Sequence, residues 1–112
     1  MSRKIPVLFF LLSVGGAAVA ADAAAGHQAV SALGRLNGIA LHCRYLDRVR
    51  DMKAAVIANA PKQRSYGLAF DEATNASFLE QIDRHAPCPG EAGFAAEVTA
   101  AVQHLEQVFA GR

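Results

Sequence analysis

Apolar residues recur along most of this chain at intervals of three and four, the spacing that places side chains on one face of an α-helix. The most regular stripe predicts a helix over residues 91–110 and comprises Phe94, Val98, Ala101, Leu105 and Val108. Glu91 suits the positive N-terminal end of such a helix, and Gly111 is a natural stop after it. This segment is the best defined element of the sequence.

A longer helical pattern covers residues 28–60 and has apolar side chains on two opposite faces. One face carries Leu36, Ile39, Cys43 and Leu46; the other carries Leu41, Tyr45, Val49, Met52 and Val56. A helix that is apolar on both sides is normally buried between neighbours, so we expect this segment to be the central element. A break near Asp47 would divide it into two helices, and Gly34 and Gly38 would permit close approach of another backbone.

Pro61 ends this pattern, and a further helix is predicted over residues 62–85. Proline disfavours helical geometry in the residue before it and suits the first turn of a new helix. Ser77 and Glu80 have the spacing of an N-terminal capping box, which would allow a restart of the helix near Asn75.

The remaining segments read as connections. Residues 86–90 are rich in proline and glycine, which indicates a turn, and the small residues of 21–26 suit a frayed start. No stretch alternates apolar and polar residues convincingly over four or more positions, so no sheet is expected. The predicted fold class is all-α: a small bundle of three or four helices, running up and down, in a single domain over residues 21–112.

The beginning of the chain has the pattern of a secretory signal. Arg3 and Lys4 precede an apolar run at 5–14, and a small-residue cleavage site of the A-x-A type ends at Ala20. The apolar run is half as long as the roughly 20 residues that a spanning helix needs. We therefore expect residues 1–20 to be a cleaved signal peptide, with no membrane insertion afterwards and a periplasmic or secreted location.

Cys43 and Cys88 are the only cysteines. In an oxidising compartment a distant pair of this kind predicts a structural disulfide. Closing a loop of this length would stabilise the fold by about 4 kcal/mol in the loop-entropy model. A metal- or redox-linked protein that uses Cys43 and Cys88 is the alternative, with His42 and His85 as conceivable further ligands.

Composition and motifs narrow the function mainly by exclusion. The chain carries 11 Lys and Arg against 10 Asp and Glu, a nearly neutral balance that gives no support for nucleic-acid binding. The four histidines form no H-E-x-x-H motif, and neither G-x-S-x-G nor C-x-x-C-H occurs. We therefore expect no enzymatic activity, catalytic residue, metal or cofactor.

Charge is distributed unevenly along the sequence. Cations exceed acids by four over residues 44–64, whereas acids exceed cations by six over 71–106. Either the two regions attract each other within the fold, or the basic region binds an acidic partner. Aromatic and arginine side chains are favoured at interfaces, although they also suit a small core. The candidate interaction surface comprises Arg48, Lys62, Arg64, Tyr66 and Phe70.

The overall layout resembles that of the small periplasmic acid-stress chaperones: a leader, about 90 further residues, helices only and one long-range disulfide. It also resembles small disulfide-bonded immunity proteins. Neither resemblance rests on a residue motif, so neither implies a site. Together with the missing catalytic motifs, the layout favours a non-enzymatic protein that binds another envelope or secreted protein, as an accessory, immunity or chaperone-like protein. A homodimer is also compatible with it.

Overall fold

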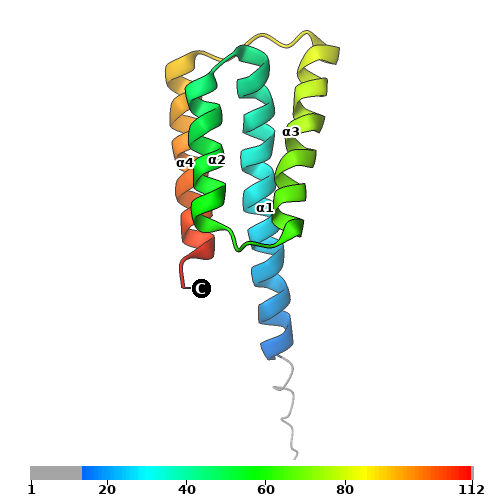
Figure 1. Cartoon of the computed structure of the whole chain (residues 1–112), viewed down its shortest axis with the longest axis vertical. Coiled ribbons are helices and arrows are strands. Elements are labelled where there is room, and N and C mark those ends of the chain that lie inside the picture. Colours follow the sequence, from blue (N-terminus) through cyan, green and yellow to red (C-terminus); the bar gives the residue numbers. More distant parts are fainter. Residues whose placement is uncertain (1–13, 112) are drawn as a thin grey trace, which may run out of the picture.

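The computed structural model describes the backbone of residues 14–111 and the side chains of residues 22–111. Its four helices are α1 (Val14–Cys43), α2 (Leu46–Asn59), α3 (Arg64–Arg84) and α4 (Glu91–Phe109). Figure 1 shows that α1 and α3 run in one direction and that α2 and α4 run in the other. The all-α prediction is confirmed, and α4 lies within one residue of its predicted bounds. Most of the predicted signal peptide lies outside the described residues.

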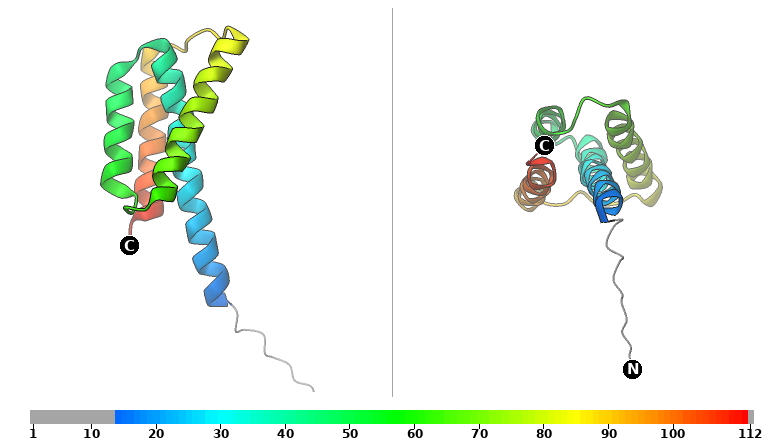
Figure 2. Two further views of the ribbon diagram at one scale, coloured as in Figure 1. Left: turned by 45° about the vertical axis from the view of Figure 1, so that its right-hand side comes forward. Right: turned by 90° about the horizontal axis from the view of Figure 1, so that it is seen from below.

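Helix α1 is the central element, as its two apolar faces predict. It packs against each of the other three helices, and α2 also packs against α4. The backbone of α3 is close to that of α1 alone and lies apart from those of α2 and α4, as the view from below in Figure 2 shows, although the Tyr66 ring of α3 meets the edge of the Phe109 ring of α4. Towards its C-terminal end α3 also leans away from α1 (Figures 1 and 2).

The helix predicted over residues 28–60 is divided in two. Helix α1 ends at Cys43 and α2 begins at Leu46, so the break comes just before the position near Asp47 that the sequence suggested. The prediction of a frayed start at 21–26 is wrong, because this segment is helical throughout. Alanine, its main constituent, has the highest helix propensity of all residues.

The break after α1 is a helix-ending motif without glycine. Arg44 adopts the left-handed conformation, with a φ of 64°. Its N–H donates to the carbonyl of Leu41, and the N–H of Tyr45 donates to the carbonyl of Ala40. This pair of hydrogen bonds is the Schellman arrangement, which usually places glycine at the left-handed position. Helix α3 ends in the same way at His85, with a φ of 51°.

Helices α1, α2 and α4 enclose most of the apolar core. Their buried side chains are Ala29, Val30, Leu33, Leu36, Ala40, Val49, Met52, Phe94, Val98, Leu105 and Phe109. Met52 and Leu105 have no exposed surface at all. Complete burial of a side chain of this size contributes roughly 1.5–3 kcal/mol. This part of the molecule is therefore stabilised by large apolar side chains.

The contact between α1 and α3 is built differently, from small residues. A Cβ atom added at Gly34 would lie 2.6 Å from the carbonyl oxygen of Phe70, and one added at Gly38 would lie 2.6 Å from that of Thr74. Such distances leave no room for any side chain. The prediction that these two glycines permit close approach of another backbone is confirmed, and the approaching backbone belongs to α3.

Polar groups are buried in the same contact. The Asn37 side-chain amide donates to the Thr74 hydroxyl over 3.2 Å, and that hydroxyl donates to the Phe70 carbonyl over 2.8 Å. The Ser77 hydroxyl donates to the Arg35 carbonyl of α1 over 2.7 Å. These bonds join the two helices through specific partners, so they fix the register of α3 along α1.

Helix α3 runs without interruption from Arg64 to Arg84. The restart allowed for near Asn75 does not occur. The hydroxyl of Ser77, which would have capped a new helix, is committed to the Arg35 carbonyl. The S-x-x-E spacing here therefore reflects a contact between helices rather than a helix start.

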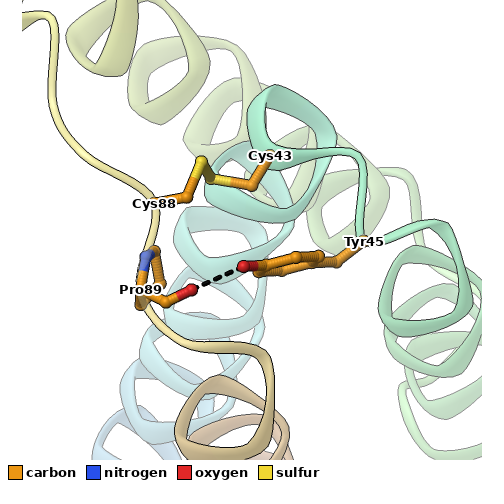
Figure 3. Close-up of a disulfide and its surroundings, with 4 residues drawn as sticks. All are labelled: Cys43, Tyr45, Cys88 and Pro89. Atoms are coloured by element: carbon orange, nitrogen blue, oxygen red, sulfur yellow. Dashed lines mark hydrogen bonds between the residues drawn. A yellow bond between two sulfur atoms is a disulfide. The ribbon is translucent and has the colours of Figure 1, made fainter.

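The predicted disulfide is confirmed. Cys43, at the end of α1, is bonded to Cys88 in the connection between α3 and α4, with their Cα atoms 5.7 Å apart (Figure 3). Beside it the Tyr45 hydroxyl donates to the carbonyl of Pro89 over 2.5 Å, and the Tyr45 ring packs against Phe94. The connection that follows α3 is thus held to the end of α1 by a covalent and a polar link.

Candidate functional site

Large apolar side chains are exposed on three of the four helices. Among the described side chains they are Leu41 on α1, Leu46 and Ile57 on α2, and Leu68, Leu79 and Ile82 on α3. Ile57 is the most exposed of them, at 66%. None of the large apolar side chains of α4 is exposed in this way. Three of these six side chains belong to α3, and Ile57 of α2 borders the space between α2 and α3.

Two adjoining hollows lie in that space. Their volumes are about 250 and 240 Å³, and both are lined by Val56 and Ile57 of α2 and by Gly67 of α3. Ala60 contributes to the first hollow and Phe70 to the second. We call this feature the α2–α3 groove. It exists because α2 and α3 both pack on α1 while their backbones stay apart from each other.

Gly67 keeps one wall of the α2–α3 groove low. A Cβ atom added there would meet no atom within 4 Å, in contrast to one added at Gly34 or Gly38. Glycine inside a helix is less favourable than alanine by roughly 1 kcal/mol. Internal packing therefore gives no reason for glycine at this position, whereas the shape of the groove does.

The rim of the groove is mainly cationic. Lys53, Lys62 and Arg64 line it, with Asp71 as the one carboxylate among the lining residues. The Lys62 ammonium donates to the Ile57 carbonyl over 2.8 Å at the C-terminal end of α2. The N-terminus of α3 lies at the same end of the groove, where its backbone N–H groups add positive potential.

The ion pairs of the described residues are local and leave this rim unneutralised. They are Arg48–Asp51, Arg50–Asp47 and Arg84–Glu80, each three or four residues apart on one helix. None of them joins the basic region of the sequence to the acidic region. The first explanation for the uneven charge was direct pairing of the two regions within the fold. The described ion pairs give it no support.

The start of α3, which forms one end of the groove, is positioned by His27 of α1. Its ring stacks on the ring of Tyr66, with 4.2 Å between centroids. The Nδ1–H group donates to the carbonyl of Ala23, since a carbonyl can only accept, and Nε2 lies 3.1 Å from the Ser65 hydroxyl. These contacts hold the first turn of α3 at a defined place along α1. The wall of the groove that α3 forms therefore begins there.

The structure brings together four of the five residues of the predicted interaction surface. Lys62 and Arg64 lie on the rim of the α2–α3 groove, and Tyr66 and Phe70 line its inner wall. The two aromatic side chains are largely buried, so they form part of the core as well as of the groove. Arg48 lies elsewhere, in a hollow between α2 and α4, and is paired with Asp51.

Sequence reasoning missed Val56, Ile57 and Gly67 as groove residues. Two signals pointed to the last two. Ile57 lies outside both apolar stripes predicted for residues 28–60, and Gly67 interrupts a segment whose other residues favour a helix. Neither signal shows by itself that the two residues face each other, because that depends on how α2 and α3 pack on α1.

A larger hollow lies between α1 and α3, with a volume of about 730 Å³. Its charged lining residues are Arg35, Glu80, Asp83 and Arg84, of which Glu80 and Arg84 pair with each other. A lining with equal numbers of both charges and few large apolar side chains favours no class of ligand. The α2–α3 groove, which is apolar with a cationic rim, is the better candidate.

No family model, curated protein or solved structure matches this chain. The candidate site therefore rests on the geometry described above. Among residues 14–111 no group of three His, Cys, Asp or Glu side chains is arranged to hold a metal ion, and both cysteines belong to the disulfide. In the same part of the chain, no helix has the length and hydrophobicity that crossing a membrane requires.

Proposed function

We propose that this chain is an exported, non-enzymatic protein that acts by binding another protein of the cell envelope or of the secreted fraction. The observation that carries the proposal is the set of exposed large apolar side chains on α3 together with Ile57 at the α2–α3 groove, in contrast to α4, whose described side chains include none. Grouped apolar exposure rimmed by charge is typical of protein-binding surfaces.

The composition of the groove supports binding rather than catalysis. Its lining combines apolar and cationic side chains with Gln63, Tyr66 and Asp71, and it contains no histidine, cysteine or serine. General acid–base and nucleophilic chemistry needs paired groups within hydrogen-bond distance of each other, and none of the described ion pairs joins Asp71 to a lysine of this lining. A surface of this kind can bind a partner without a reaction.

Export is supported by the signal pattern and by the disulfide between Cys43 and Cys88, a bond that persists in oxidising compartments. The test is to determine the N-terminus of the native protein from each cell fraction. We expect a chain that begins at Ala21, in the periplasmic or secreted fraction, with both cysteines oxidised. A full-length, reduced chain that stays in the cytosol would contradict export.

The binding proposal is tested by placing a photoreactive amino acid at single positions of the oxidised protein. Leu79 and Ile57 report on the proposed surface, and Gln103 on α4 is the control position. We expect adducts with another exported protein at the first two positions and none at Gln103. If the adducts are absent throughout, or equally abundant at Gln103, the proposal is wrong.

An acid-triggered mode of action has less support. The described ion pairs are exposed and local, so each contributes little to the stability of the fold. Protonation of their carboxylates would therefore remove little of what holds the helices together. The large apolar core and the disulfide do not titrate in the acidic range.

A further inference from the structure

We infer that the α2–α3 groove binds one amphipathic helix of the partner protein, with apolar residues directed into the two hollows and acidic residues beside the cationic rim. This inference rests on the proposed function and specifies its partner. Three features of the groove support it: the size of the hollows, the glycine in its wall and the sign of its charge.

The hollows suit side chains rather than a whole small molecule. At about 250 and 240 Å³, each lies below the roughly 300 Å³ at which pockets for small ligands begin. They adjoin each other along α2 and α3, since both include Val56, Ile57 and Gly67. Successive anchors on one face of a helix, three or four residues apart, would occupy such a pair of hollows.

Gly67 indicates that something approaches the groove wall closely. Glycine at Gly34 and Gly38 is required because α3 lies against those positions, and a Cβ atom there would collide with its backbone. Gly67 is equally helical but faces open space within this chain. Gly93 of α4 faces open space in the same way, but Gly67 lies in the wall of both hollows, so the backbone or side chains of a bound helix would use the space that it leaves.

The charges indicate an acidic partner. Lys53 and Arg64 take part in no ion pair of the described residues, and Lys62 bonds only to a backbone carbonyl. A helix with Asp or Glu beside its apolar face would neutralise these cations on binding. Complementary charge of this kind raises the rate of association and excludes basic partners.

A second copy of this chain fits less well than a different protein. Its most acidic helix, α4, already buries its apolar face in the core. The outer face of α3 carries Leu68, Leu79 and Ile82, but Glu72 and Asn75 lie between them at the same helical spacing. That face therefore lacks the continuous apolar stripe that the groove requires.

The test uses the oxidised full mature chain with the photoreactive residue at Ile57, mixed with the exported proteins of the producing cells. Peptide sequencing of the adduct identifies the segment that was captured. Gly67→Leu fills the groove, and Lys53→Glu combined with Arg64→Glu reverses its rim. Gly93→Leu and Arg35→Glu are the matched controls, because Gly93 also faces open space and Arg35 lies in the hollow on the other side of α3.

We expect the captured segment to be an acidic amphipathic helix of another protein. We also expect Gly67→Leu and the double charge reversal each to lower the adduct yield at least tenfold, while the controls leave it within twofold. A captured segment from this same chain, or one that is basic or extended, would overturn the inference. So would a yield that is insensitive to Gly67→Leu in a variant that melts as the wild type does.

The outcome at Leu79 separates this inference from the proposed function. Adducts at Leu79 without any at Ile57 would mean that the protein binds a partner but not through the groove. The absence of adducts at both positions would mean that the proposed function itself fails.

Discussion

Helix α1 has two kinds of interface in one small molecule. Towards α2 and α4 it presents large apolar side chains that fill a core, whereas towards α3 it presents Gly34, Gly38 and the buried amide of Asn37. The first interface is stabilised by the apolar area removed from water. The second depends on close contact of backbones and on a few specific hydrogen bonds. Helix α3, which is held in the second way, buries Tyr66 and Phe70 but leaves Leu68, Leu79 and Ile82 exposed.

This difference explains where the exposed apolar surface lies. Because α3 packs on α1 and its backbone stays apart from that of α2, Leu68, Leu79 and Ile82 of α3 and Ile57 of α2 stay exposed. Helix α4, which packs into the large core from α1 and α2, exposes no large apolar side chain among those described. The exposed side chains of α3 and the neighbouring side of α2 are thus the part of the molecule best suited to bind a partner.

Loss of the disulfide should lower the free energy of unfolding most. Cys88→Ser opens a loop with a sequence separation of 45, which costs about 4 kcal/mol in the loop-entropy model. We expect this loss in urea denaturation, and faster hydrogen exchange in α3 than in α4, because the tether follows α3. Cys43→Ser should behave identically. Uniform exchange across all helices would mean that the two interfaces of α1 do not differ in strength as described.

Truncation of the large core should come next. Leu105→Ala removes a completely buried side chain and should destabilise the protein by about 2–5 kcal/mol. The corresponding truncation at the exposed Leu79 should change the free energy of unfolding by less than about 0.5 kcal/mol. The free energy of unfolding is measured by urea denaturation. Equal losses for the two variants would show that the outer face of α3 is packed as tightly as the core.

A methyl group added in the interface between α1 and α3 tests directly how closely the two helices pack. Gly38→Ala places a Cβ atom 2.6 Å from both the Thr74 carbonyl oxygen and the Ser77 Cβ atom, so α3 must move away. We expect a loss of about 1–3 kcal/mol, despite the higher helix propensity of alanine. Thermal denaturation measures it. A gain in stability would mean that α1 and α3 can separate freely, and the comparison between the interfaces would fail.

The smallest expected effect has the opposite sign. Gly67→Ala adds the same methyl group where nothing lies within 4 Å, so only the helix propensity changes. The protein should become more stable by roughly 0.5–1 kcal/mol. The melting temperature of this variant should rise while that of Gly38→Ala falls. A decrease for Gly67→Ala would show that the groove is filled by this chain itself and is not open.

The helices and the disulfide could be predicted from sequence because their signals are local or paired. The stripe of residues 91–110 and the pair of cysteines needed no knowledge of the fold. The break at Arg44 was harder to place, because a left-handed residue that ends a helix is usually glycine, and here arginine adopts that conformation. The same reason applies to His85 at the end of α3.

The candidate site was only partly predictable. The basic and aromatic residues around Lys62 and Arg64 stood out by composition, and four of the five predicted residues do meet at the groove. Arg48 was included because it is near in sequence, but it lies towards α4. Ile57 and Gly67 come from different helices whose backbones stay apart, and no periodicity within one helix can show that they share a hollow.

The covalent link also has a consequence for biogenesis. Two cysteines allow one intramolecular pairing, so oxidation cannot scramble this chain into a wrongly connected monomer. A simple thiol oxidase is sufficient for its maturation, and a disulfide isomerase has no error to correct within a single molecule. The incorrect products are chains joined to each other by intermolecular disulfides, which form most readily when unoxidised molecules are crowded together.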